Sequence, residues 1–264
     1  MVSYRDLILM LRDLGLESYS RVLVHASLDA FEQLEGGSQT LVGALLETCE
    51  TVIMPAFTRR TMVIPECGPP DNAIQYGSAD EENGQAAIFA YDLPVDAGIG
   101  DVAEQLRLQS RAMRSGHPIL SFAGVNAEEA LARQTLESPL GVIDWLAEYD
   151  GDVLLIGVGH RRNFSLHYAE NLVDRRTFLR WALTISGVVE CPNMPGCTDG
   201  FQAIAPRLDG ISRRDVLDGA PFELVPVRDL LNVASGWLRE DPDALLCSRE
   251  DCPYCSLLRH PADG

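Results

Sequence analysis

Short apolar runs and amphipathic segments alternate along most of the chain. Residues 4–14 carry leucine and isoleucine at helical spacing, and Ser3 with Asp6 forms a capping pair at the start of that helix. Three apolar runs rich in β-branched residues are typical of buried strands: residues 21–27, 51–57 and 152–159. A Gly-Gly turn and a helix over residues 38–49 separate the first two runs. This strand–helix–strand order predicts an α/β sheet.

The same alternation continues towards the C-terminus. Further helices are predicted over residues 98–109, 126–134, 138–151 and 228–240, and further strands over residues 119–124, 177–190 and 222–227. One long irregular excursion over residues 59–97 interrupts the pattern, and such loops are often functional. We therefore predict one α/β domain over residues 1–264, in which residues 187–264 contribute a zinc-bound C-terminal subregion if the cysteines there hold a metal.

Composition and charge narrow the possible partners. The chain has 264 residues, 46% of them hydrophobic, and can bury a sizeable core. Its apolar runs are shorter than the roughly 20 residues that span a bilayer, and the N-terminus lacks a signal-peptide pattern, so we expect a cytoplasmic protein without a membrane partner. The formal charge of −18 argues against nucleic acid and is compatible with a cationic ligand, although solubility alone explains it equally well.

The stretch GHRRNFSLHYAEN, residues 159–171, carries the strongest candidate chemistry. It follows a buried strand, and strand ends are where α/β folds usually bind ligands. A helix that begins near residues 163–165 places His167 and Glu170 on one side, because they are three residues apart. A carboxylate beside an imidazole fixes its tautomer and makes it a better general base. By spacing alone, an ordinary polar pair on a helix explains the pattern equally well.

Two other polar motifs flank predicted strands. RSGHP, residues 114–118, is a donor-rich turn that suits a phosphate or a polar cofactor arm, or is an ordinary loop. VHASL, residues 24–28, places polar side chains at the end of the first strand, where His25 is either a ligand contact or a satisfied core histidine. Neither a GxGxxG nor a GxxxxGK[ST] motif is present, so no dinucleotide or P-loop site is predicted.

Several blocks together resemble the aminoglycoside 3-N-acetyltransferase family, which transfers acetyl from acetyl-CoA to an antibiotic amine. The resemblance covers roughly residues 20–190, with the blocks in the family's order and spacing. The blocks are VLVHASL (22–28), EGGSQTLVGALLE (35–47), VIMPAFT (52–58), GDVAEQLR (100–107), RSGHPILSFAGVNAEEAL (114–131), SPLGVIDWLAEYDGDVLLIGVG (138–159) and NFSLHYAE (163–170). It implies a three-layer α/β/α sandwich with a central mixed sheet, here followed by a cysteine-rich C-terminal appendage.

The resemblance also implies roles for individual residues. The family's catalytic histidine matches His167, its neighbouring acid matches Glu170, and a further acid in the helix before RSGHP matches Glu104. Asp92 is a candidate for the substrate side. The coenzyme is expected along VHASL, the turn at residues 54–58 and RSGHP, which implicates His25, Ser27, Ser115 and His117. The chain departs from the family in three places: Phe164 stands where a threonine is common, the connector DLPVDAGIG lacks the usual Thr-Pro step, and most members lack the cysteine-rich end. The first two lie on the substrate side.

The implied reaction is direct acetylation of an amine, with a histidine as general base. The substrate is expected to be a cationic aminoglycoside acetylated on its 3-amino group, and acetyl-CoA is the co-substrate. Backbone N–H groups around Ser27 or in the turn at residues 54–58 are candidate donors to the oxyanion. Two alternatives stay open: an acyl-CoA N-acyltransferase acting on another amine in natural-product biosynthesis, and a ligand-binding homologue without turnover.

Five of the seven cysteines fall in the last third of the chain. CPNMPGC (191–197) and CSREDCPYC (247–255) give the spacings C-x5-C and C-x4-C-x2-C, and zinc sites commonly use such a two-residue gap. Four thiolates close a tetrahedral structural site. The predicted ligands are Cys191, Cys197, Cys252 and Cys255, with Cys247 as the alternative to the first pair. Reduced, half-buried thiols without a metal are the other interpretation.

Overall fold

The computed structural model describes residues 1–77 and 83–259, and a seven-stranded sheet forms its centre. The strand order is β4-β5-β2-β1-β6-β10-β9. β1 runs parallel to both β2 and β6, and the remaining neighbours are antiparallel, so the predicted mixed sheet is confirmed. The strands are β1 (Arg21–Ala26), β2 (Thr51–Pro55), β4 (Ala112–Arg114), β5 (Phe122–Val125), β6 (Asp152–Ile156), β9 (Arg213–Leu217) and β10 (Ala220–Pro226).

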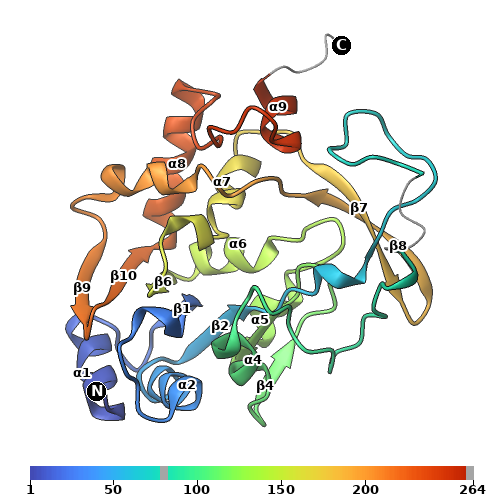
Figure 1. The fold of residues 1–264 in the computed structure, drawn as a ribbon. Helices are drawn as coiled ribbons and strands as arrows, with labels where there is room; N and C mark the ends of the chain where they lie inside the picture. The colour runs from blue at the N-terminus through green and yellow to red at the C-terminus, as the bar shows by residue number, and fades with distance from the viewer. Residues whose placement is uncertain (78–82, 260–264) are drawn as a thin grey trace.

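Successive side chains of the central strands point to opposite faces of the sheet and pack in two different hydrophobic cores. Leu23 and Val153 pack with residues of α5, α6, α7 and α8, whereas Val22 and Leu154 pack with residues of α1, α2 and α4. Because β1 and β6 are buried on both faces, helices must cover both sides of the sheet. Figure 1 shows α1 and α2 on one side of β1 and β2, and α6 and α8 on the other. The expected three-layer α/β/α architecture is confirmed.

The helices agree with the predicted segments. Ser3 and Asp6 form a capping box that starts α1, because each side chain accepts from the other residue's backbone N–H. The helices are α1 (Tyr4–Asp13), α2 (Gly37–Thr48), α4 (Asp101–Arg107), α5 (Glu128–Ala132), α6 (Gly141–Glu148), α7 (Leu166–Asn171), α8 (Val227–Glu240) and α9 (Pro253–Arg259), with short 3₁₀ helices η1 (Leu28–Ala30), η2 (Arg59–Thr61), η3 (His160–Arg162) and η4 (Phe201–Leu208). Among the residues that the structure describes, no helix is long and apolar enough to cross a bilayer.

The predicted strand at residues 177–190 is in fact a hairpin. β7 (Phe178–Thr184) and β8 (Gly187–Met194) pair antiparallel across a tight turn, and Gly187 there has a φ of 107°, which a glycine adopts without strain. The short strand β3 (Met62–Val63) pairs with β7 and forms a second, three-stranded sheet. The irregular excursion is therefore attached to this hairpin (Figure 1).

Candidate active site

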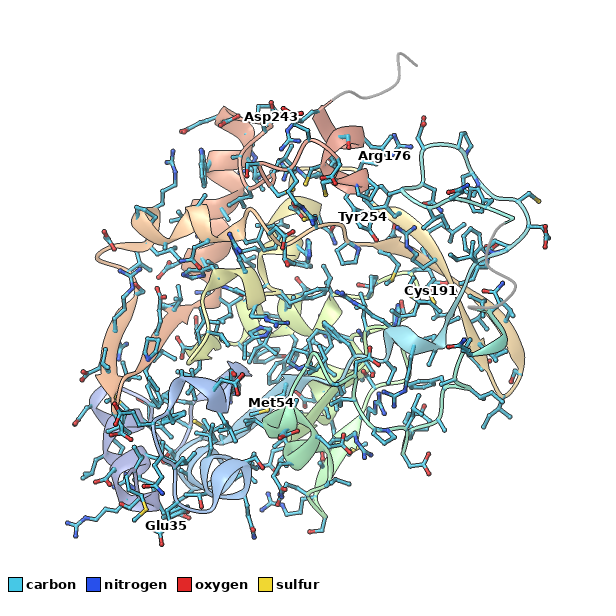
Figure 2. The ribbon with its side chains drawn as sticks, viewed as in Figure 1. Glu35, Met54, Arg176, Cys191, Asp243 and Tyr254 are labelled. Carbon is cyan, nitrogen blue, oxygen red and sulfur yellow. The ribbon has the colours of Figure 1, made fainter. Side chains whose placement is uncertain are left out.

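A cavity of about 680 Å³ opens where the three parallel strands end. Ala26 at the end of β1, Pro55 at the end of β2 and Gly157 directly after β6 all line it. Met54, which also lines the cavity, lies near the middle of the molecule (Figure 2). Parallel α/β sheets bind ligands beyond the carboxyl ends of their strands, so this cavity is in the expected place for a substrate site.

Charged side chains of both signs line the cavity. The lining acids and arginines are Asp29, Asp96, Asp101, Arg59, Arg161 and Arg162. Asp96 also holds the wall together, since it accepts a hydrogen bond of 2.5 Å from the backbone N–H of Arg59 and forms an ion pair with Arg60. None of these residues was predicted from the sequence. The available signal was the place of five of them directly after strands or within the irregular excursion, whereas Asp101 is the first residue of α4.

Two of the residues predicted to contact the coenzyme line the cavity. His25 is buried, and its Nε2 has no hydrogen-bond partner among the described residues. Burial and, to a smaller extent, the nearby charge of Arg162 lower the pKa of His25 to about 3. Its imidazole is therefore neutral at neutral pH. The Ser27 hydroxyl faces the same cavity, and it donates to the Asp29 carboxylate over 3.2 Å.

Three of the backbone donors expected for an oxyanion are engaged within the chain. The N–H of Ser27 donates to Ile156 O over 2.9 Å and so continues the pairing of β1 with β6. In the turn after β2, the N–H groups of Ala56 and Thr58 donate to Ser121 O and Ile119 O. These three groups are therefore not available to an oxyanion in this arrangement, and a backbone donor from either segment stays a prediction.

His167 and Glu170 form a buried pair on α7. The helix begins at Leu166, as predicted, and His167 Nδ1 lies 2.6 Å from Glu170 Oε2. A carboxylate that accepts this bond fixes the proton on Nδ1 and leaves the lone pair on Nε2. Within residues 1–77 and 83–259, His167 Nε2 is buried without a hydrogen-bond partner. A buried basic nitrogen of this kind is suited to take a proton from a ligand.

Two phenylalanines enclose the ring of His167. The rings of Phe164 and Phe201 each have their centroids 4.7 Å from that of His167, in edge-on arrangements. Phe164 lines the cavity, whereas His167 is not among the described residues of its wall. The histidine is therefore one side chain away from the cavity, and Phe164 stands between the two.

Glu170, and not Glu104, is the carboxylate that holds His167. The second oxygen of Glu170 accepts from Arg175 over 2.8 Å, in a largely buried ion pair. Glu104 accepts instead from Arg107 over 2.6 Å and from the N–H of Val95. The pKa of Glu104 is lowered chiefly by the hydrogen bond with Arg107. These bonds connect the end of the irregular excursion with α4.

Side chains of the RSGHP turn form hydrogen bonds with neighbouring residues of the chain. The Ser115 hydroxyl donates to Gln134 over 2.5 Å and accepts from the N–H of Phe122. Nδ1 of His117 accepts from the N–H groups of Ile119 and Leu120. Neither side chain is among the described residues that line the cavity, and their contact with a coenzyme stays a prediction.

Asp92 also lies outside the described cavity wall. It is exposed in a turn, and Asp96, four residues later, occupies the position at the cavity that was expected for Asp92. Sequence periodicity does not indicate which of the two acids faces the cavity, because the segment has no regular secondary structure. Of these two acids, Asp96 is the one that lines the cavity, and a substrate role for Asp92 stays a prediction.

A second histidine, His160, stabilises the turn that follows β6. It is fully buried, and its Nε2 lies 3.3 Å from the carboxylate of Glu223 on β10. Burial alone raises the pKa of Glu223, but His160 and Arg214 outweigh it and lower that pKa to about 2. The pair anchors the motif that leads to α7 on the neighbouring strand.

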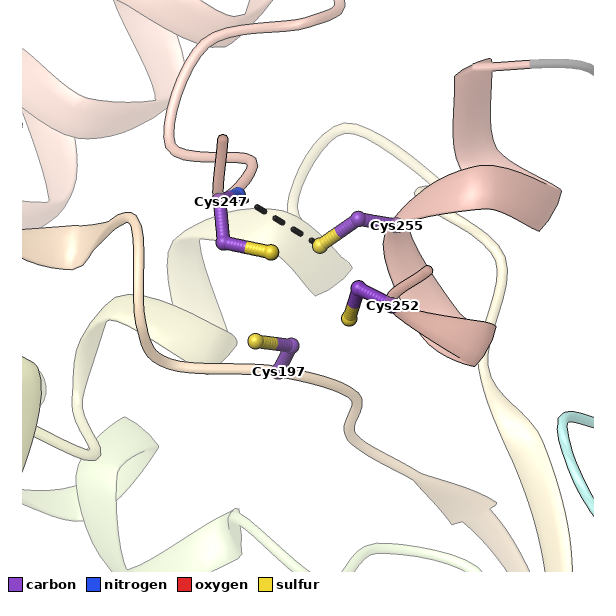
Figure 3. A group of neighbouring side chains, drawn as sticks. All are labelled: Cys197, Cys247, Cys252 and Cys255. Atoms are coloured by element: carbon purple, nitrogen blue, oxygen red, sulfur yellow. Dashed lines mark hydrogen bonds between the residues drawn. The ribbon is translucent and has the colours of Figure 1, made fainter. Parts of the chain in front are cut away.

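Four cysteines gather at the C-terminal end of the chain (Figure 3). The thiols of Cys197, Cys247, Cys252 and Cys255 all lie within 4.8 Å of one another, and we call them the four-thiol group. Cys191, which was predicted as a ligand, is buried in the main core on β8 and is not a member of this group. Cys247, the alternative, takes its place, because β8 turns the side chain of Cys191 towards the core.

The comparison with known proteins identifies the family. The family model described as aminoglycoside 3-N-acetyltransferase matches residues 23–239. The chain belongs to the aminoglycoside 3-N-acetyltransferase family. Aminoglycoside N(3)-acetyltransferase IV from Salmonella sp is 30% identical over 98% of this chain and 95% of its own length. Aminoglycoside N(3)-acetyltransferase IX from Micromonospora chalcea is 33% identical, and that match covers 63% of this chain and 61% of the relative.

Solved structures agree with this family. The crystal structure of aminoglycoside acetyltransferase AAC(3)-IVa, as apoenzyme, superposes with a TM-score of 0.79 at 25% identity, over 98% of this chain and 97% of that one. The YokD protein from Bacillus subtilis also has a TM-score of 0.79, at 20% identity and over 90% of this chain and 94% of that one, and shares the fold. The match to AAC(3)-IVa includes the C-terminal region, so at least this family member has a corresponding region.

The buried His117 predicts a loss of stability in mild acid. Its folded-state pKa is lowered from 6.5 to about 4, chiefly by burial, so the unfolded chain binds a proton at a higher pH than the native state. Stability is therefore lost as the pH falls from about 6.5 to about 4, by up to about 3 kcal/mol from this group. In His117→Asn, an amide oxygen replaces Nδ1 as acceptor and does not titrate. We expect its melting temperature to fall less between pH 7.5 and pH 4.5 than that of the wild type.

Melting curves at both pH values, read by circular dichroism, measure this difference. Parallel falls in the two proteins would show that His117 is not the titrating group.

Proposed function

We propose that this protein is an acetyl-CoA-dependent N-acetyltransferase that acetylates the 3-amino group of an aminoglycoside. Family membership, together with the buried His167–Glu170 pair beside the cavity, supports this proposal. Solved relatives include AAC-IIIb in binary complex with CoASH, and AAC(3)-IVa in complex with a gentamicin or with apramycin. The cavity at the strand ends is large enough for the reacting parts of both substrates, because ligand pockets commonly measure about 300–1,000 Å³.

The charges of the cavity wall suit two ligands of opposite sign. Asp29, Asp96 and Asp101 attract the ammonium groups of an aminosugar, and the net charge of −18 favours its approach from solution. Arg161 and Arg162 offer donors to the phosphates of coenzyme A. His25 and Ser27 also line the cavity, and the unpartnered Nε2 of His25 is available to the pantetheine arm or the thioester.

In the proposed mechanism, the substrate ammonium first loses one proton to solvent, and the free amine attacks the thioester carbonyl. As the carbon–nitrogen bond forms, His167 Nε2 takes the second proton from the attacking nitrogen, and the carbon–sulfur bond then breaks. The proton then passes to the departing thiolate, so the imidazole returns to its neutral state. Glu170 holds Nδ1–H throughout and stabilises the imidazolium. The transfer is direct, and no side chain forms a covalent intermediate.

Replacing either member of the pair tests this mechanism. We expect His167→Ala to lower kcat about 10²–10⁴-fold, because general-base assistance is lost. Glu170→Gln should also lower kcat, since a neutral amide does not stabilise the imidazolium. The matched variant Glu104→Gln removes a carboxylate that contacts Arg107 and not His167, and it should keep most of the activity.

Thiol release from acetyl-CoA, with product mass raised by one acetyl group, measures turnover on a panel of aminoglycosides. Binding of coenzyme A to each variant, measured by calorimetry, serves as the control for folding and should change only slightly. Full turnover by His167→Ala would overturn the assignment of the base. Turnover with other amines but with no aminoglycoside would favour a biosynthetic acyltransferase of the same fold, and binding without turnover would favour a ligand-binding homologue.

Phe164 is proposed to control access to the base. Its ring lines the cavity and packs against both Phe57 and His167, so a bulky amine reaches Nε2 only after this ring moves. Phe164→Thr shortens the side chain to the family's common residue. We expect it to raise kcat/KM for bulky aminoglycosides by roughly 10-fold, the low end of what small changes in pocket volume achieve.

The same change should lower stability, because removing a buried ring costs about 3–5 kcal/mol. Phe57→Leu is the matched control, since Phe57 lines the cavity and contacts Phe164 but is not stacked on His167. Steady-state kinetics with a large and a small aminoglycoside decide the outcome. A fall in kcat at unchanged KM for Phe164→Thr would contradict a gating role.

We also propose that the four-thiol group binds one zinc ion. Tetrahedral zinc with Zn–S bonds of about 2.3 Å places its sulfurs about 3.8 Å apart, and thiols already within 4.8 Å need only small movements to reach that arrangement. Three of the four residues are buried, as structural zinc ligands usually are, and four sulfur ligands leave no open position for chemistry. When bound, the ion contributes binding energy to folding, about 10–16 kcal/mol in zinc-finger peptides.

Metal analysis tests this site and its ligands. Protein purified without a histidine tag should contain about one zinc per chain, and cobalt should give the absorption of a tetrahedral thiolate complex. Cys247→Ser should abolish binding, whereas Cys191→Ser should retain it, because Cys191 lies in the core. Zinc near zero in freshly purified wild-type protein would refute the site.

A cytoplasmic location is proposed on chemical grounds. The reaction needs acetyl-CoA, which is a cytoplasmic metabolite. All seven cysteines are free thiols in the structure, which is the usual state in a reducing compartment.

A further inference from the structure

Two chain segments that are far apart in sequence are connected to the two sides of the His167–Glu170 pair, one directly and the other through Arg175. One is residues 197–201, which ends at the first residue of η4, and the other is residues 242–247, between α8 and α9. Each segment contains a member of the four-thiol group, Cys197 in the first and Cys247 in the second. Figure 3 shows Cys197 on one chain segment and the other three cysteines on the C-terminal part.

The first segment forms part of the wall around His167. Thr198 directly follows Cys197 and lines the cavity. The N–H of Phe201 donates to Thr198 O over 3.0 Å, and the fully buried Phe201 ring packs on the ring of His167. A shift of Cys197 would therefore move both the cavity wall and one of the two rings that hold the imidazole.

The second segment positions the carboxylate of Glu170 through Arg175. Arg175 donates to Glu170 Oε1 over 2.8 Å, and its other terminal nitrogen donates to the carbonyls of Pro242 and Ala244. The guanidinium is largely buried, with an exposed fraction of 7%, so its position depends on these two carbonyls. The chain leading to Cys247 thus sets the place of Arg175, and Arg175 sets the place of Glu170.

The two segments also touch each other directly. A Cβ atom added at Gly200 would lie close to two backbone oxygens, 2.3 Å from Leu245 O and 2.4 Å from Leu246 O. Between the segments, an exposed ion pair joins Arg249 to Asp199 over 2.9 Å, and such exposed pairs contribute little. Metal–thiolate bonds at the four-thiol group would be a far stronger link between the same two segments.

We propose that a zinc ion bound by Cys197, Cys247, Cys252 and Cys255 is a positioning site for the His167–Glu170 pair. By joining the two segments, the ion fixes the ring wall through Phe201 and the carboxylate through Arg175. The ion is outside the cavity wall and takes no part in the chemistry. The role of the pair as catalyst rests on the proposed function, but its geometry is measurable without turnover.

The hydrogen bond between His167 Nδ1–H and Glu170 gives a direct readout. A buried N–H bonded to a carboxylate over 2.6 Å should give a strongly low-field proton resonance, assigned by its absence in His167→Ala. We expect this resonance in zinc-loaded protein and its loss or broadening after a chelator removes the metal. Adding Zn²⁺ alone should restore it. Mg²⁺, which prefers oxygen ligands, should have no effect.

Far-UV circular dichroism monitors folding in the same samples. A resonance that persists unchanged in zinc-free, folded protein would overturn the proposal. If instead the resonance depends on zinc but no aminoglycoside is acetylated, the proposed function fails and the positioning site stands. These two failures are therefore distinguishable.

If the zinc-free chain unfolds, two variants that retain all four thiols still test the coupling with the metal bound. Arg175→Gln should keep its zinc, weaken the low-field resonance and lower kcat roughly tenfold, with little change in KM for acetyl-CoA, because one interaction of the carboxylate is lost. Gly200→Ala should act on the other side, because the added methyl group separates the two segments and displaces Phe201.

Arg228→Gln is the matched control. Arg228 likewise donates to two backbone carbonyls, of Ala147 and Glu148, and forms an ion pair with Asp150, but it lies on the surface of α8. We expect wild-type resonance, zinc content and rates in this variant. Wild-type behaviour of both Arg175→Gln and Gly200→Ala, with zinc bound, would refute the coupling.

Discussion

The buried carboxylate of Glu170 is the interaction on which the candidate site depends. One carboxylate oxygen is hydrogen-bonded to His167 and the other is paired with Arg175. Each oxygen therefore has a partner at a position where little water is present. Removing Arg175 would take the opposite charge away from this buried carboxylate, which is costly. Because Arg175 is in turn held by carbonyls of the C-terminal segment, the orientation of a base on α7 depends on residues far along the chain. The bond from Arg175 to Pro242 spans a separation of 67 residues.

The sheet explains why this pair lies beside a cavity. β1, β2 and β6 are parallel and end on the same edge, and the chain leaves each of them in a turn that contributes to the wall. Strands buried on both faces supply a rigid base for these turns. The turns are free to carry charged side chains because they face the cavity and not a core. In this way an apolar centre supports a polar site of mixed charge.

Much of the fold was predictable because the two cores leave a periodic signature in the sequence. The apolar runs of β1 and β6, helical spacing in α1 and the Ser3–Asp6 capping box are local patterns, and each was confirmed. Local spacing also predicted the contact of His167 with Glu170, since three residues of helix bring them together. The irregular excursion carries no such signal, and there the acid that lines the cavity is Asp96. The RSGHP turn resembled a ligand site, but Ser115 and Nδ1 of His117 are hydrogen-bonded to neighbouring parts of the chain.

Local periodicity and ordered motifs were enough to establish the α/β class, the family and the residues of the His167–Glu170 pair. Tertiary contacts were needed to establish which cysteines meet, which acid faces the cavity and what encloses the histidine. Cys191 and Cys247 are equally plausible ligands by spacing, yet β8 directs Cys191 into the core, whereas the turn after α8 brings Cys247 to Cys255. Which of several similar side chains come together depends on contacts between distant segments. The local sequence pattern does not specify these contacts.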